Sequence, residues 1–259
     1  MFNPDLNQTP INIMPKSVVF LIILIAFVEA ILQLGQKGLI GDQASIAWRM
    51  QLIQKYGFFD TIFEWMRHNS TYNFNGLIRF LTYSFIHKST MEIIFVLVFI
   101  ATFGKFIAEV FGDIAVLLIF IFSGIIGAIG FGVFSNGTFL VGGYPAVYGL
   151  IGAFTWAQFS IQRMKGETGF RAFHLIIFFM ALALIYNLVY SNNSNEWIAE
   201  IIGFISGFCI SIIIKISKEK FILQDIHLVT NSCFIYILSL IHISEPTRQE
   251  AISYAVFCL

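Results

Sequence analysis

Three glutamates in long apolar runs are the residues of this chain best placed to do chemistry. Glu29, Glu92 and Glu200 each lie within or near a run long enough to cross a bilayer. A carboxylate is costly inside a membrane, so each of these glutamates is a functional-site hypothesis. Such a group can bind a proton or a polar ligand, or it can belong to a satisfied polar cluster. For Glu29 we expect a place near a membrane edge or a pairing with an interfacial base.

The composition places these carboxylates in a membrane protein. The chain has 259 residues, of which 58% are hydrophobic and 12% charged, and its mean hydropathy is +0.81. Soluble domains carry about 25% charged residues, so we expect one compact polytopic membrane domain. The net charge is zero, and no basic face indicates a nucleic-acid partner. The three cysteines are scattered and lack ligand spacing; they are Cys209, Cys233 and Cys258. We therefore expect no disulfide, no metal site and no cofactor.

Six segments are long and apolar enough to span a bilayer, given a requirement of about 20 residues. They are Lys16–Leu34, Thr90–Phe111, Asp113–Phe134, Pro145–Gln162, Arg171–Val189 and Trp197–Ile216. A loop from Gly35 to Arg79 separates the first two and mixes aromatic with basic residues. That mixture is typical of a segment lying in the bilayer interface.

Basic residues in short flanks predict the orientation, because they favour the cytoplasmic side. With the N-terminus inside, the inner flanks hold Lys16, Lys105, Arg163, Lys165, Arg171, Lys215, Lys218 and Lys220, whereas the short outer loops hold none. We therefore expect both termini in the cytoplasm.

The chain divides by composition into four parts. Residues 1–15 read as a short cytoplasmic N-terminus, 16–216 as the membrane domain, and 217–237 as a cytoplasmic tail whose place in the native protein is open. Residues 238–259 begin LSLIHISEPTR, which resembles the translation of a sequencing adapter. Such cloning scars are left out of fold reasoning, and we expect the true C-terminus to differ.

Four blocks in order resemble the rhomboid family of intramembrane proteases. They are R-x-x-T-x-x-F-x-H from Arg79 to His87, F-G-x-x-x-E from Phe103 to Glu109, the segment Gly143 to Gly152, and G-x-x-x-G from Gly203 to Gly207. The resemblance covers about residues 79–207. It implies an all-α, polytopic membrane protein with the six-transmembrane-helix rhomboid fold and a long interfacial first loop. It also implies a bacterial cytoplasmic membrane, since no extra domain is attached.

The same resemblance identifies the positions of a Ser–His dyad, and neither residue is present. The serine position holds Tyr144 and the following glycine position holds Pro145; the histidine position, three residues before Gly203, holds Glu200. A phenol is a weak nucleophile toward amides near neutral pH, and a carboxylate does not replace the proton exchange of imidazole. We expect Tyr144 to donate a hydrogen bond to Glu200.

The positions of the family's oxyanion donors are altered as well. The resemblance places them at Glu92 and Val96. A carboxylate repels a developing oxyanion and valine donates no hydrogen bond, and losing one donor alone costs about 10²–10³ in rate. We therefore expect no rhomboid-type proteolysis and assign no catalytic residue.

Small residues predict one close helix contact. Gly149 and Gly152 lie on the predicted fourth span, and Gly203 and Gly207 on the sixth. Helices in lipid associate closely where small residues let their backbones approach. We expect these glycines to pack the two helices together.

The leading hypothesis is a rhomboid-like pseudoprotease, surrounded by lipid, that binds the transmembrane segments of single-span client proteins without cleaving them. Two alternatives stay open. One is an active intramembrane serine protease with an unrecognised nucleophile. The other is a small transporter that uses its carboxylates as proton sites, although the chain shows no internal repeat of the kind many transporters have. The sequence does not decide the oligomeric state.

Overall fold

A computed structural model describes residues 13–40, 47–135, 139–181 and 195–214. Residues 1–217 form one compact unit, and residues 218–259 form a second unit that lies outside the described residues. The predictions for residues 217–237 and 238–259 therefore fall outside the described part, and they stay predictions.

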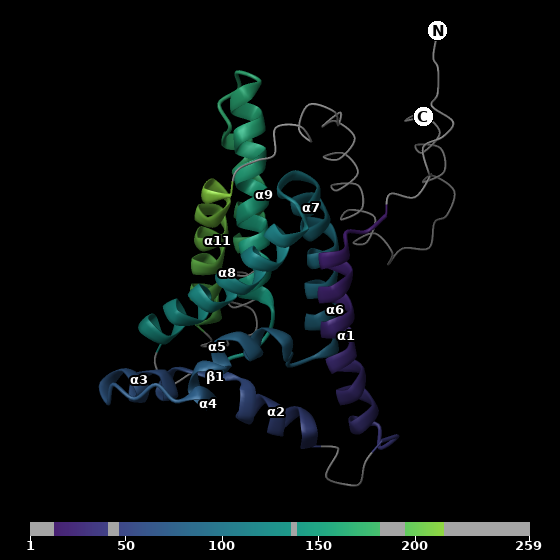
Figure 1. Ribbon diagram of the computed structural model, residues 1–259, viewed down its shortest axis with the longest axis vertical. Coiled ribbons are helices and arrows are strands. Elements are labelled where there is room, and N and C mark those ends of the chain that lie inside the picture. The colour runs from purple at the N-terminus through teal and green to yellow at the C-terminus, as the bar shows by residue number, and fades with distance from the viewer. Residues whose placement is uncertain (1–12, 41–46, 136–138, 182–194, 215–259) are drawn as a thin grey trace. The chain divides into compact units, whose positions relative to one another are not determined.

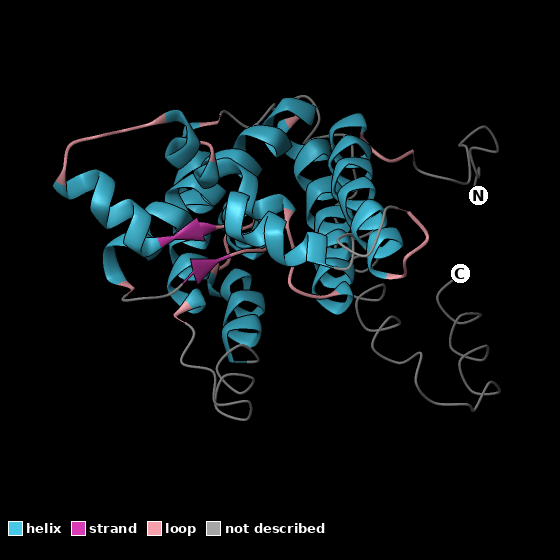
Figure 2. Cartoon of the chain, turned by 90° about the horizontal axis from the view of Figure 1, so that it is seen from below, coloured by secondary structure: helices cyan, strands magenta, loops and turns pink. Residues whose placement is uncertain are grey.

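The described part of the chain is helical apart from one pair of two-residue strands (Figures 1 and 2). In order, its elements are α1 (Lys16–Gln36), α2 (Trp48–Tyr56), β1 (Phe58–Phe59), α3 (Asp60–His68), α4 (Phe74–Leu77), α5 (Arg79–Thr82), η2 (Tyr83–Phe85), α6 (Thr90–Phe99), η3 (Ile100–Gly104), α7 (Lys105–Phe111), α8 (Asp113–Phe134), β2 (Phe139–Leu140), α9 (Tyr144–Met164), η4 (Phe170–Phe173) and α11 (Glu196–Ile213).

Four helical segments of the described residues are long and apolar enough to cross a membrane. They are Lys16–Gln36, Thr90–Phe111, Asp113–Phe134 and Glu196–Ile213. The second consists of α6, the π-helical turn η3 and α7 in succession. This confirms the prediction of an all-α polytopic membrane protein, with span boundaries within three residues of those expected.

The other two predicted spans differ from these four. α9 has 21 residues, but it is less apolar, since its sequence includes Thr155, Gln158 and Gln162. A membrane helix tolerates such residues here because most of the surface of α9 is buried against other helices and does not face lipid. The fifth predicted span is described only as the apolar helical segment Phe170–Ala181; its remainder lies outside the described residues. The number of six spans stays a prediction.

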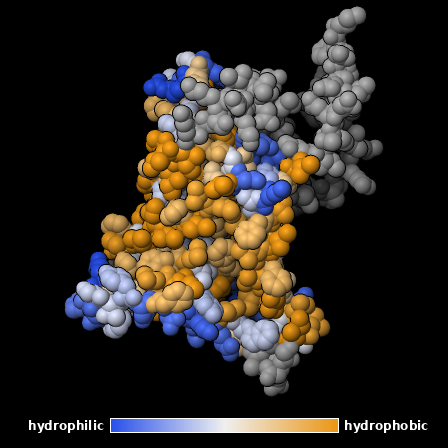
Figure 3. Space-filling model, viewed as in Figure 1, coloured by the Kyte–Doolittle hydropathy of each residue, from blue (hydrophilic) through white to orange (hydrophobic). Residues whose placement is uncertain are grey.

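The first loop folds into short helices at one end of the bundle, which we call the loop end (Figure 1). β1 pairs antiparallel with β2, so the loop is joined to the segment that leads into α9. Arg79 extends this junction by donating to the carbonyl of Gly57 at 2.7 Å. Hydrophilic side chains gather over these short helices on the face seen in Figure 3, while hydrophobic side chains cover the middle of the long helices. This distribution suits a loop at a bilayer interface.

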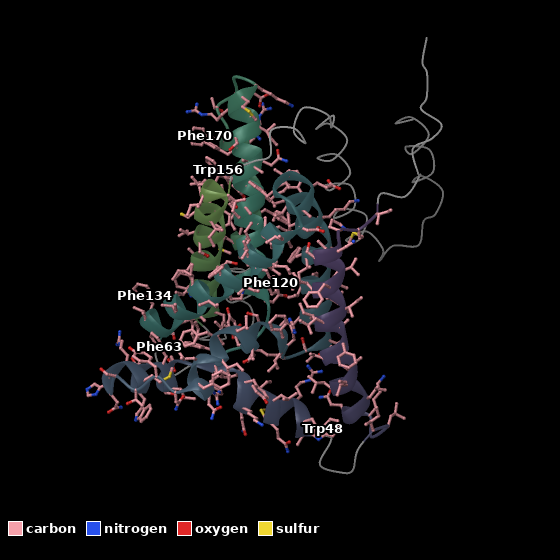
Figure 4. All side chains as sticks on the ribbon, in the orientation of Figure 1. Trp48, Phe63, Phe120, Phe134, Trp156 and Phe170 are labelled. Carbon is pink, nitrogen blue, oxygen red and sulfur yellow. The ribbon has the colours of Figure 1, made fainter. Side chains whose placement is uncertain are left out.

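α8, α9 and α11 pack against one another and form the centre of the unit. The core between them is built of small and branched side chains such as Ala146, Ile151 and Ala153, which are fully buried. Phenylalanines such as Phe58 and Phe131 are also buried in the core, and other aromatic side chains lie toward the two ends of the unit. Phe63 and Phe134 lie near the loop end, and Trp156 and Phe170 lie toward the opposite end (Figure 4).

Candidate functional site at the start of helix α9

The residues before α9 are held by two hydrogen bonds that their backbone N–H groups donate to the segment before α6. The Gly142 N–H donates to the carbonyl of Tyr83 at 3.0 Å, and the Gly143 N–H donates to Nε2 of His87 at 3.3 Å. Gly142 has φ +108°, which side chains rarely permit, and a Cβ there would collide with the Glu92 carboxylate. Glycine is therefore required at Gly142, and Tyr144 begins its helix from a fixed position.

Glu92 has a structural task at the start of its own helix. The Ser89 hydroxyl accepts from the Glu92 N–H at 3.3 Å, and the Glu92 carboxylate accepts from the Lys88 N–H at 2.8 Å. This reciprocal arrangement resembles a capping box, although the carboxylate reaches the residue before the N-cap. One oxygen of Glu92 also lies against Gly142. The sequence pattern Ser-x-x-Glu could have revealed this role.

Val96 lies one turn after Glu92 and is fully buried. Its Cγ1 atom would lie 3.0 Å from a Cβ built on Gly143. A methyl group therefore occupies the space beside the peptide that precedes Tyr144. It packs there and offers no hydrogen bond.

Glu200 interacts electrostatically with Tyr148, which lies one helical turn after Tyr144. Sequence analysis did not single out Tyr148, although the spacing of one turn on α9 could have suggested it. The expected bond between Tyr144 and Glu200 stays a prediction. The carboxylate oxygen Oε2 of Glu200 is buried and has no hydrogen-bond partner.

Four charged side chains meet around this point. Glu92 and Glu196 both lie close enough to Glu200 to repel its carboxylate, and Lys88 attracts it. Lys88 forms an ion pair with Glu196 and also lies over the ring of Phe139, 5.5 Å from its centroid. We call Glu92, Glu196 and Glu200 the acidic cluster. The structure thus brings the predicted residues Glu92 and Glu200 together and adds Glu196 and Lys88, which the sequence analysis had not linked to them.

Glu29 lies apart from this cluster, in a buried ion pair with Arg49 of α2. Arg49 binds both carboxylate oxygens, at 2.7 and 3.1 Å, and also donates to the carbonyl of His87 at 2.7 Å. Gln33 donates to the same carboxylate at 2.8 Å. Glu29 is thus paired with a basic residue of the first loop, as one of the two expectations had it, while the interfacial position of that residue stays a prediction. This pair connects α1 to the first loop and to His87.

His87 links the ion pair to the start of α9. Burial, opposed by the attraction of Glu29 and reinforced by the repulsion of Arg49, lowers the pKa of His87 to about 4. Its imidazole is therefore neutral near pH 7, and Nε2 accepts the hydrogen bond from Gly143. Because Nε2 is occupied in this way, the ring is a positioning group for the loop. Sequence analysis placed His87 outside the spans and gave it no role.

α9 and α11 approach so closely that only glycine fits at several positions. A Cβ on Gly203 would collide with the carbonyl of Pro145, and a Cβ on Gly207 with the backbone of Gly149. A Cβ on Gly152 would collide with the carbonyl of Phe204. These contacts fix the position of α11 along α9, and so they hold Glu200 of α11 beside Tyr148 of α9.

A protein-family model, the rhomboid domain, matches residues 75–217, which is more than half of the chain. The chain belongs to the rhomboid family. A search of curated proteins returned no match. The family assignment confirms the resemblance of the four sequence blocks, and this rhomboid is an integral membrane protein.

The described residues of this rhomboid contain no pairing of a serine, threonine or cysteine with a histidine. Ser123, Ser206 and Ser211 all donate to backbone carbonyls of their own helices. The His174 ring contacts the carbonyl of Arg171. No group of three His, Cys, Asp or Glu side chains in the described ranges is arranged to hold a metal ion.

Proposed function

We propose that this rhomboid is a pseudoprotease that binds the transmembrane segments of client proteins without cleaving them. The observation that carries the proposal is that Glu200, with Tyr148 beside it, stands where the family resemblance puts the catalytic histidine. The two dyad positions that the resemblance identifies hold Tyr144 and Glu200, and a phenol is a weak nucleophile toward amides near neutral pH.

The neighbouring positions support the same conclusion. Glu92 is engaged in capping its own helix, and Val96 presents a methyl group to Gly143. An oxyanion formed beside them would meet negative charge and a hydrocarbon instead of donors. The fold around these positions is retained, as the close packing of Gly207 against Gly149 illustrates. Retention of the helical frame without its chemistry favours a binding role.

Localisation belongs to the same proposal. We infer a bacterial cytoplasmic membrane with the N-terminus inside, because basic residues flank the ends of the helices opposite the first loop. Lys16 begins α1, and Arg163 and Lys165 lie at the end of α9. Reaction of single introduced cysteines with a membrane-impermeant maleimide on intact cells tests this. Labelling at residue 165 with protection at residue 70 would contradict the orientation.

Lack of proteolysis is tested with a fluorophosphonate probe on the purified full chain. We expect no labelling of the wild type above a heat-denatured control. Labelling that disappears on substitution of one serine would overturn the pseudoprotease proposal and restore the protease.

Client binding is tested by placing a photoreactive phenylalanine analogue at Tyr144 in protein reconstituted with a synthetic single-span peptide. The control carries the analogue at Ile114, which is exposed near the start of α8. We expect crosslinking from position 144 to exceed that from position 114 and to saturate with peptide. Equal, non-saturating yields at both positions would indicate random collision in the bilayer and would count against binding.

A further inference from the structure

The acidic cluster has three carboxyl groups beside one ammonium, and one buried oxygen within it is unpaired. A single ammonium, that of Lys88, acts on Glu92, Glu196 and Glu200. Lys88 bonds to Glu196, one turn before Glu200 on α11, and attracts Glu200 only through space. Oε2 of Glu200 is left buried without a donor. A buried unpaired polar atom is uncommon in folded proteins and calls for a specific explanation.

The type of missing donor follows from the arrangement. A metal ion would need ligands converging to about 2.0–2.6 Å, and none of the described carboxylates form a group suited to that. Longer-range attraction to several carboxylates, with one hydrogen bond to Oε2, suits an organic cation on a flexible stem. Lys88 already shows this mode, because its ammonium contacts a carboxylate and an aromatic face together. A lysine or arginine of another chain has the same chemistry.

The position of the cluster selects where such a residue would lie. Glu92 is near the start of α6 and Glu196 begins α11, so both lie where membrane-spanning helices end, beside the first loop. Glu196 and Lys88 are partly exposed, with side-chain exposures of 26% and 37%. Basic residues at the ends of transmembrane segments extend their charged groups toward this level. An approaching cation would therefore meet Glu196 first and Glu200 deeper inside.

We propose that the acidic cluster is a recognition site for a lysine or arginine at the interfacial end of a client's transmembrane segment. This inference rests on the proposed client binding and specifies which client is preferred. The ammonium or guanidinium donates to Oε2 of Glu200 and is attracted by Glu92 and Glu196. An uncharged client residue at that level leaves Oε2 unpaired, which gives the preference its physical origin.

The test uses the full chain in lipid nanodiscs with synthetic single-span peptides of leucine and alanine. Each peptide carries lysine, arginine, methionine or glutamate at both ends of its apolar segment, so its orientation does not matter. A photoreactive leucine beside the variable residue reports capture. A hydrogen bond between charged groups predicts about tenfold to hundredfold tighter capture of the lysine and arginine peptides than of the methionine peptide. The glutamate peptide should be captured least.

Two variants assign the preference to the cluster. Glu200→Gln removes the buried carboxylate, and Glu196→Gln removes the more exposed carboxylate. The second variant provides the test if the first one does not fold. Each should reduce the preference for lysine over methionine to within about twofold. Glu64→Gln, the same change at an exposed glutamate of the first loop, should leave it unchanged.

The outcomes separate this inference from the proposed function. Equal capture of the lysine and methionine peptides would overturn the recognition of a basic residue while leaving client binding in place. A lysine preference that survives both cluster variants, or that Glu64→Gln also removes, would overturn it too. Failure to capture any peptide would instead refute client binding.

Discussion

Replacing Arg49 by methionine should destabilise this protein more than any change to an exposed basic residue of the first loop. Arg49 binds both oxygens of Glu29 and the carbonyl of His87 through three hydrogen bonds of 2.7–3.1 Å. The side chains of Arg49 and Glu29 are 10% and 9% exposed. Methionine fills similar space but donates nothing, so a buried carboxylate and a buried carbonyl lose their partner.

The magnitude follows from what is left unpaired. Breaking a buried ion pair by removing one partner costs about 3–5 kcal/mol. Gln33 still donates to Glu29, which places the expected loss near the lower end, at about 3 kcal/mol. Replacing Glu29 by glutamine in the Arg49→Met background removes the orphaned charge. The double variant should therefore be more stable than the single variant by about 1–2 kcal/mol.

The assay is unfolding in mixed micelles of increasing SDS fraction, followed by circular dichroism. Arg67→Met is the matched control, because Arg67 is an exposed arginine of the same loop, and it should shift the free energy of unfolding by less than about 0.5 kcal/mol. A loss at Arg49 no larger than at Arg67 would refute the reasoning. A double variant less stable than Arg49→Met would show that the orphaned carboxylate is not the cause.

Three further outcomes are expected in the same unfolding assay. Gly207→Leu forces α11 away from the backbone of Gly149 and should cost about 1–3 kcal/mol; a neutral result would contradict the close approach. Because the pKa of His87 is lowered to about 4 from 6.5, the unfolded chain takes up a proton first, and stability should fall by about 3 kcal/mol between pH 6.5 and 4. A His87→Gln variant with the same pH slope would disprove that assignment. Glu92→Leu removes the acceptor of the Lys88 N–H and should cost about 1 kcal/mol; no loss would argue against a capping role.

The spans were predictable because they depend on local properties of the chain. The boundaries of Thr90–Phe111 and Asp113–Phe134 follow from the length of the apolar segments and from Gly112. This glycine has a φ of +98° and separates the two helices. α9 was predicted both as an apolar span and as the helix of the Gly143 to Gly152 block, although its polar residues lower its hydropathy. Its burial between other helices, rather than contact with lipid, permits those residues.

The candidate site was predictable only in part. The family resemblance assigned Glu92 to an oxyanion position and Glu200 to a dyad position, and the two side chains lie close enough for their charges to interact. The roles of Tyr148, Lys88 and Glu196 were not foreseen. Each depends on which side chains neighbouring helices bring together, and the distance in sequence between Lys88 and Glu196 gives no sign of their contact.

The sequence by itself determined that this is a helical membrane protein of the rhomboid family, and it predicts that Tyr144 and Glu200 stand at the dyad positions. These facts depend on residue type, apolar length and local spacing. Only the tertiary structure decided that Glu92 caps its own helix, that Arg49 neutralises Glu29, and that one oxygen of Glu200 stays unpaired. The physical reason is that the cost of a buried charge is set by partners from other elements, and these come together only when the helices pack.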